Sequence, residues 1–196
     1  MTQQRRGDWT LLDQREVYTN PWITLTEHRV LNPSGNPGIY GVVQFRNLAI
    51  GIIALEDDGD IWLVGQHRFP LDAYSWEIPE GGAPLDEDPL AGARRELKEE
   101  TGIEALTWRE ISRLHLSNSV SDETGIIYLA TELSHGAAAP DETEALGLRR
   151  LPAAEAYRMA RRGELTDSMT VAGLYRLRLM ALEGELPPAL AAKVLA

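Results

Sequence analysis

The sequence contains no cysteine. This absence excludes both a disulfide framework and a thiolate metal site. No apolar run approaches the roughly 18 residues that a membrane-spanning helix needs. The first eight residues are polar, and no apolar stretch follows Arg5 and Arg6, so we expect no signal peptide. Together these absences predict a cytoplasmic protein.

Basic residues are scarce relative to acidic ones. Nineteen Lys and Arg against thirty Asp and Glu give a formal net charge of −11. A field of this sign repels nucleic acid and anionic membrane surfaces, so we expect neither as a partner. It also repels a phosphate-bearing small molecule unless local cations intervene. The 196 residues, 43% of them hydrophobic, suit one globular domain or one domain with a small appendage.

The first part of the chain, from Trp9 to Arg46, is rich in β-forming residues. Alternation predicts a strand at 22–26 and its partner at 40–45, with a turn cluster at 32–38 between them. A second hairpin is predicted from strands at 48–55 and 61–66, because Asp58-Gly59 is a strong turn signal between apolar runs.

A helix is predicted between Asp88, a capping residue, and Gly102, which suits a helix end. Pro89 suits its first position. The apolar residues of one face are Leu90, Ala93 and Leu97. Further predicted elements are strands at 107–115 and 125–131 and helices at 153–162 and 170–182. This order of elements predicts an α+β fold in which a mixed β-sheet is packed by helices.

Three glutamates occupy the end of the first helix. Glu96 and Glu100 stand on one face, and Glu99 borders it. The helix dipole disfavours anions at this end. One interpretation is a solvated face, with the charge offset by nearby basic residues. The other is a site for Mg²⁺, which binds carboxylate oxygens and bridges to phosphates, and which reverses the local field.

The segment resembles the Nudix box, G-x5-E-x7-R-E-U-x-E-E-x-G-U, where U is a bulky aliphatic residue. Every defined position is matched over the 23 residues from Gly81 to Ile103. The matching residues are Gly81, Glu87, Arg95, Glu96, Leu97, Glu99, Glu100, Gly102 and Ile103. The resemblance implies a Nudix fold, with the sheet sandwiched between helices and an N-terminal antiparallel β-extension.

The resemblance also implies a metal site for Mg²⁺, with Mn²⁺ as the alternative. Glu96 and Glu100 would be the principal ligands, and Glu99 would contribute directly or through water. The backbone carbonyl of Glu80 would be a further ligand. Glu99 and Glu100 thereby become catalytic candidates.

Residues outside the box resemble ADP-ribose and nucleotide-sugar pyrophosphatases. The run Trp76–Gly81 resembles their approach to the box and marks Glu77 as a substrate-binding candidate. Arg68, in Gln66–Phe69, matches an arginine that contacts substrate phosphate, a task suited to a guanidinium fork. The region from 151 to 167 resembles their late helix and turn.

The loop from Ser117 to Glu123 departs from the pattern, because Asn118 replaces an expected proline. The resemblance therefore extends to the nucleotide-sugar class and not to ADP-ribose alone. By its place in this loop, Glu123 is the candidate general base, with Asp122 as the fallback and a solvated or metal-binding carboxylate as the alternative. Trp22 is the candidate for stacking the nucleobase; a core position is the alternative.

The predicted function is metal-dependent hydrolysis of the pyrophosphate bond in a nucleoside diphosphate linked to a sugar. Residues 1–46 would form an N-terminal β-region for base binding and dimerisation, and residues 47–196 the Nudix hydrolase domain. A homodimer is implied by the resemblance. The alternatives are hydrolysis of dinucleoside polyphosphates or nucleoside triphosphates, and a non-catalytic sensor of ADP-ribose-type ligands.

Overall fold

A computed structural model describes residues 4–138 and 146–196. By its contacts the chain divides into two units, which are described separately below. The N-terminal unit comprises Met1–Leu48 and His115–Thr124, and the second unit comprises Ala49–Leu114 and Gly125–Ala196.

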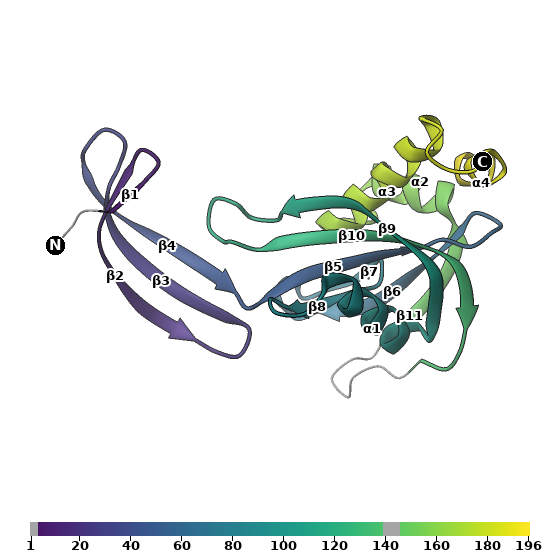
Figure 1. The fold of residues 1–196 in the computed structure, drawn as a ribbon, viewed down its shortest axis with the longest axis horizontal. Coiled ribbons are helices and arrows are strands. Elements are labelled where there is room, and N and C mark those ends of the chain that lie inside the picture. The colour runs from purple at the N-terminus through teal and green to yellow at the C-terminus, as the bar shows by residue number, and fades with distance from the viewer. Residues whose placement is uncertain (1–3, 139–145) are drawn as a thin grey trace. The chain divides into compact units, whose positions relative to one another are not determined.

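The N-terminal unit is built on an antiparallel sheet with the strand order β1-β2-β3-β4 (Figure 1). The strands are β1 (Gln4–Arg6), β2 (Trp9–Thr19), β3 (Ile23–Leu31) and β4 (Pro37–Phe45). The predicted pairing of the third and fourth strands is confirmed, although both are longer than predicted. The sequence did not locate β2, because two register shifts against β3 break its alternation.

The loop from 115 to 124 is anchored to β4. The Val43 N–H donates to the Val120 carbonyl over 2.8 Å, and the Val43 carbonyl accepts from the Asp122 N–H over 3.2 Å. The Tyr40 hydroxyl donates to the Ser119 carbonyl over 2.6 Å. These bonds explain why a loop so distant in sequence belongs to the N-terminal unit.

The second unit contains two sheets, with strand orders β8-β5-β10-β9 and β11-β6-β7. In the first, β5 and β10 are parallel; in the second, β6 is antiparallel to both neighbours. The bounds are β5 (Asn47–Ala54), β6 (Asp60–Arg68), β7 (Ala73–Glu77), β8 (Glu80–Pro84), β9 (Ile103–His115), β10 (Thr124–His135) and β11 (Gly147–Pro152). The predicted strands at 107–115 and 125–131 are confirmed as the neighbours β9 and β10.

The predicted second hairpin is wrong beyond its turn. The turn forms, with Gly59 at a φ of 90°, but β5 and β6 share only one bridge, between Leu55 and Ile61. They then run in different sheets. The reason is that β5 is a central strand. It pairs with β8 on one edge and with β10 on the other, so no edge remains for β6, and it is buried from Ile50 to Ala54.

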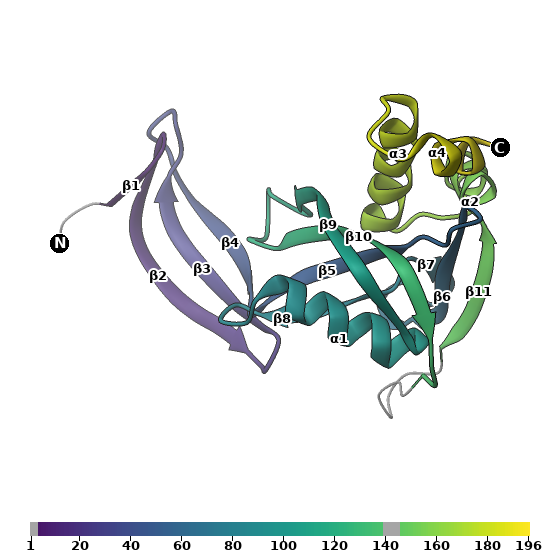
Figure 2. The ribbon, with the colours of Figure 1, turned by 45° about the vertical axis from the view of Figure 1, so that its right-hand side comes forward.

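Helix α1 lies on one side of the β8-β5-β10-β9 sheet, and the later helices lie on the other (Figures 1 and 2). Their bounds are α1 (Pro89–Thr101), α2 (Ala153–Arg162), α3 (Ser168–Leu182) and α4 (Pro188–Leu195), and a short 3-10 turn spans Phe69–Leu71. Helix α2 has its predicted bounds, and α3 starts two residues earlier than predicted because Asp167 caps it. The predicted α+β class is confirmed; α4 was not predicted.

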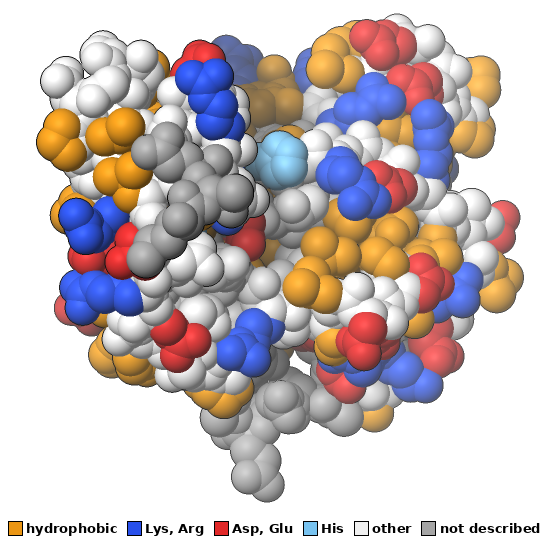
Figure 3. Space-filling model, turned by 60° about the vertical axis from the view of Figure 1, so that its left-hand side comes forward, with side chains coloured by type: hydrophobic (Ala, Val, Ile, Leu, Met, Phe, Trp, Pro, Cys, Tyr) orange, Lys and Arg blue, Asp and Glu red, His pale blue; other side chains and the backbone are white. Residues whose placement is uncertain are grey.

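Charged side chains of both signs lie on the surface (Figure 3). On the face drawn in Figure 3, acidic and basic side chains are interspersed, and hydrophobic side chains gather in separate patches. Among the helices of the described residues, none is long and apolar enough to cross a membrane.

Candidate active site

The box helix α1 has the predicted start and end. The Asp88 carboxylate accepts the Leu90 N–H over 3.2 Å, and Gly102 adopts a φ of 71° after the last turn. Ala93 and Leu97 are fully buried. This anchoring fixes the rotation of the helix and turns its carboxylates towards the loop that begins at Glu80.

Glu96 lies directly over the backbone of Gly81. A Cβ atom at Gly81 would stand 2.0 Å from Glu96 Cδ, so only glycine permits this approach. The carboxylate accepts from the Gly82 N–H over 3.2 Å and from Arg95 Nη1 over 2.7 Å. Burial raises the pKa of Glu96, and the bond from Arg95 opposes that rise.

Glu100 and Glu99 differ in burial. Glu100 is 2% exposed, and its Oε2 accepts the Glu80 N–H over 3.0 Å. About half of the Glu99 side chain is exposed, and its carboxylate accepts from Arg95 Nη1 over 3.1 Å. Arg95 also donates to the Gly82 carbonyl over 2.8 Å, so one guanidinium joins the loop to two of the helix carboxylates.

The donor set fits a hard divalent cation. Three carboxylates and a nearby backbone carbonyl offer oxygen ligands only, as Mg²⁺ and Mn²⁺ prefer. Within the described residues no three His, Asp or Glu side chains already converge on one point. Glu96, Glu99 and Glu100 would hold such a cation together with several water molecules, which is how Mg²⁺ is usually bound.

Arg68 is paired with Glu77. Arg68 Nε lies 3.0 Å from both carboxylate oxygens, and Nη2 also donates to Glu77. Glu77 is almost fully buried, whereas about a third of the Arg68 side chain is exposed. The carboxylate raises the pKa of Arg68 and fixes its orientation. The structure thus brings two predicted substrate-binding residues together.

Glu80 has a second, unpredicted set of contacts through its side chain. Its carboxyl group accepts from Thr170 Oγ1 over 3.3 Å and lies close to Asp167. Burial, followed by the charge of Asp167, raises the pKa of Glu80 well above its usual range. The signal in the sequence that marks Asp167 is its helix-capping position before α3.

A cavity of about 380 Å³ opens beside these groups. Its lining residues come from two segments that are far apart in the sequence, one around Arg68 and one around Asp167. The lining residues are Arg68, Pro70, Leu71, Ser75, Glu77, Thr166, Asp167 and Ser168. The cavity therefore combines a cation with carboxylates and hydroxyls, groups that hydrogen-bond to phosphates and to sugar hydroxyls.

Trp22 and Glu123 belong to the N-terminal unit. Trp22 is 65% exposed, so it is not a core residue. The Asn20 carboxamide accepts both the Trp22 and the Ile23 N–H over 2.8 Å, which fixes the turn that presents the indole. Burial, and next the charge of Asp122, raises the pKa of Glu123. Asp122 itself accepts the Phe45 N–H over 2.8 Å, a structural contact.

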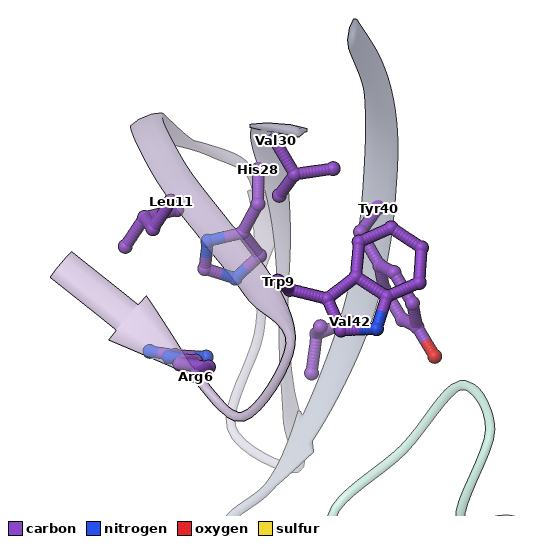
Figure 4. A pocket seen from close by; sticks show the side chains of 7 residues that line it. All are labelled: Arg6, Trp9, Leu11, His28, Val30, Tyr40 and Val42. Carbon is purple, nitrogen blue, oxygen red and sulfur yellow. The ribbon is translucent and has the colours of Figure 1, made fainter. Parts of the chain in front are cut away.

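The N-terminal sheet also carries an aromatic pocket of about 220 Å³ (Figure 4). Trp9 and Tyr40 meet edge to face in it, with ring centroids 5.3 Å apart. Within the described residues, His28 Nδ1 is buried without a hydrogen-bond partner, and burial lowers the pKa of His28. The pocket is lined by Arg6, Trp9, Leu11, His28, Val30, Tyr40 and Val42. The sequence missed it because these residues come from alternate positions of four strands.

The fold and the box together define a Nudix protein, and comparison with known families agrees. Residues 45–170 match the NUDIX domain, and residues 9–43 match the nucleoside diphosphate sugar hydrolase N-terminal domain. The chain belongs to the Nudix family and is an enzyme of the hydrolase class. Nudix hydrolases generally depend on a divalent metal.

Similar proteins include two bacterial enzymes. The chain is 32% identical to an ADP-ribose pyrophosphatase of Mycobacterium tuberculosis, over 85% of this chain and 82% of the relative. It is 29% identical to an ADP-ribose pyrophosphatase of Bacillus subtilis, over 85% of this chain and 90% of the relative. The crystal structure of an ADP compounds hydrolase superposes with a TM-score of 0.81, covering 93% of this chain and all of that one, at 21% identity. This likeness confirms the predicted Nudix fold.

Proposed function

We propose that this chain hydrolyses the pyrophosphate bond of a nucleoside diphosphate linked to a sugar, giving a nucleoside monophosphate and a sugar phosphate. The observation that carries the proposal is the intact box: every glutamate is present, and the loop around Gly81 holds Glu96 and Glu100 against its backbone. The names of the two bacterial relatives favour ADP-ribose or a similar compound.

Glu96, Glu99, Glu100 and the Glu80 carbonyl would hold Mg²⁺, with Mn²⁺ as the alternative. When bound, the cation supplies charge neutralisation for the diphosphate and an increase in the acidity of water. Arg95 keeps two of the carboxylates in place through its hydrogen bonds. The bond to Glu96 favours the ionised form of that carboxylate, which is the form that binds a cation.

Arg68 would bind a phosphate oxygen from the wall of the 380 Å³ cavity. Glu77 occupies one edge of its guanidinium and leaves the remainder for the substrate. Glu123 would accept the proton of the attacking water as general base. Its raised pKa brings it closer to the operating pH, where a general base is most effective.

Residues 1–46 would bind the nucleobase and form the homodimer contact. Trp22 offers an exposed indole for stacking, and the pocket of Trp9 and Tyr40 is a second aromatic surface in the same unit. Variants at Trp22 and at Tyr40 distinguish the two surfaces. Loss of the residue that stacks on the base should raise KM for the nucleotide substrate, and substitution at the other surface should leave that KM unchanged.

The test is a substrate panel with Mg²⁺, Mn²⁺ or EDTA. ADP-ribose, ADP-glucose, GDP-mannose, UDP-glucose, a diadenosine polyphosphate and nucleoside triphosphates are incubated with the protein, and the released monophosphates are quantified. Glu100→Gln should lower kcat by about two orders of magnitude or more, since a metal ligand supplies several kcal/mol of transition-state stabilisation. Glu110→Gln is the matched control, because Glu110 lies on β9 and pairs with Arg113 outside the site.

Cleavage of a diphosphate sugar that EDTA and Glu100→Gln both abolish supports the proposal. Preferential cleavage of the diadenosine polyphosphate or of triphosphates assigns the chain to those substrates instead. Tight binding of ADP-ribose without turnover of any compound identifies a sensor. Near-normal turnover by Glu100→Gln refutes the metal-ligand assignment.

A further inference from the structure

The segment that joins β7 to β8 is held from three sides. The Ile78 N–H donates to Thr170 Oγ1 over 3.0 Å, and the Glu80 N–H donates to Glu100 Oε2 over 3.0 Å. Between them, the Pro79 carbonyl accepts the Ile52 N–H over 2.9 Å. Proline has no N–H, so every backbone donor from 78 to 80 is engaged. The position of this segment determines where the Glu80 carbonyl lies.

Thr170 is the contact that comes from farthest away in sequence. It is completely buried in the first turn of α3, 92 residues from Ile78 and 90 from Glu80. Its hydroxyl accepts from Ile78 and donates to Glu80 Oε1 over 3.3 Å. A hydroxyl has one proton and two lone pairs, so this single group can bond both the backbone of Ile78 and the side chain of Glu80.

The threonine is itself fixed. Its N–H donates to Asp167 Oδ2 over 2.7 Å, which is the cap of α3. Gly173, one turn later in the helix, allows α3 to approach Ile53 closely, since a Cβ there would lie 3.1 Å from Ile53 Cδ1. Helix α3 is thus packed closely against β5. The hydrogen bond from Ile78 to Thr170 therefore fixes the backbone of residues 78–80 relative to this helix.

We infer that Thr170 is a positioning residue for the divalent-cation site, because its hydroxyl fixes the backbone that carries the Glu80 carbonyl and the N–H that orients Glu100. The inference rests on the proposed function, in which both groups are metal ligands. Groups that orient metal ligands typically change metal affinity or activity about 10–100-fold when they are removed. Thr170 has no contact with substrate in this scheme and acts only through residues 78 to 80.

The test measures metal binding directly, in the full-length protein and without substrate. Mn²⁺ is titrated, and free Mn²⁺ is followed by electron paramagnetic resonance. Thr170→Val keeps the shape of the side chain and removes the hydroxyl; it should weaken Mn²⁺ affinity about 10–100-fold. Thr170→Ser retains the hydroxyl and should restore most of that affinity. If the valine variant does not fold, Thr170→Ala is measured by the same criteria.

Leu177→Ala is the control for general loss of stability. Leu177 is buried in the same helix, two turns beyond Thr170, and has no polar contact with the segment. It should lower the melting temperature and leave Mn²⁺ affinity unchanged. If Leu177→Ala weakens Mn²⁺ binding as much as Thr170→Val, the role of Thr170 is merely structural and the inference is overturned.

Glu100→Gln separates this inference from the proposed function. If Glu100→Gln weakens Mn²⁺ binding and Thr170→Val does not, only the positioning role is overturned. Absence of Mn²⁺ binding by the unaltered protein overturns both the positioning role and the metal site on which it rests.

Discussion

Substitution of Gly81 by alanine tests the geometry of the box most directly. The new Cβ would stand 2.0 Å from Glu96 Cδ and 2.2 and 2.5 Å from the carboxylate oxygens. Ordinary contact begins at 3.4 Å, so the carboxyl group has to move by 1.4 Å, the difference of 3.4 and 2.0. The terminal atoms of a glutamate can move this far without disturbing the helix, so we expect the fold to persist.

The displaced carboxylate loses its bonds to the Gly82 N–H and to Arg95. A misplacement of about 1 Å in a catalytic group costs about 100-fold in rate, or about 2.7 kcal/mol. The effect on stability is smaller: the two lost hydrogen bonds cost about 1 kcal/mol each, and the Gly→Ala change recovers about 0.4–1 kcal/mol through the unfolded chain. Activity should therefore fall about 100-fold while the melting temperature changes by no more than about 6 °C.

The assay compares kcat for the preferred diphosphate sugar with the melting temperature measured by calorimetry. Gly41→Ala is the matched control, because a Cβ at Gly41 meets nothing within 4 Å. We expect that control to retain the rate of the unaltered enzyme. A Gly81→Ala variant with activity near that of the control would refute the argument that Glu96 must lie over the Gly81 backbone.

Three further predictions concern Glu123, Glu77 and Trp22. Because burial raises the pKa of Glu123 above its ordinary 4.5, and a base acts only when deprotonated, kcat/KM should increase as the pH rises through that raised pKa. Glu123→Gln should lower the rate about 10²–10⁴-fold and remove this acid limb; a pH–rate profile that keeps the limb would assign it to another group. Glu77→Gln should raise KM about tenfold, since an amide offers Arg68 only one oxygen acceptor, and an unchanged KM would contradict the orienting role of Glu77. Trp22→Ala should raise KM by a factor equivalent to about 1–3 kcal/mol of lost stacking free energy. The melting temperature should not change, because the indole is exposed, and a large fall in melting temperature would point to a structural role.

The parts of the fold that the sequence predicted are those governed by local signals. Helix α1 was predicted with its cap and its terminating glycine because both act within a few residues. The partners of β5 and β6 were predicted wrongly, since a turn signal specifies the reversal of the chain but not the sheet in which each strand continues. The sheet of each strand is determined by the pairing of β5 with β8 and β10 on its two edges.

The candidate site shows the same division. Its carboxylates follow from a motif confined to 23 residues of sequence. The contact of Thr170 with Ile78 and the pairing of Arg68 with Glu77 depend on which strands and helices meet. No spacing rule connects residues 78 and 170, so the sequence could indicate the proposed metal ligands but not the residues that hold them in place. The aromatic pocket on the N-terminal sheet was missed for the same reason.

The net charge of −11 and an anionic substrate are compatible because the box carries its own cation. Arg95 bonds to Glu96, to Glu99 and to the Gly82 carbonyl, so two glutamates are neutralised in part before any metal binds. A divalent cation added to this arrangement makes the site less negative than the glutamates alone would allow. Arg68 adds a second guanidinium at the wall of the cavity, where it is paired with the buried Glu77. The two arginines and a bound divalent cation would therefore reduce the negative charge that the diphosphate otherwise meets at the carboxylates.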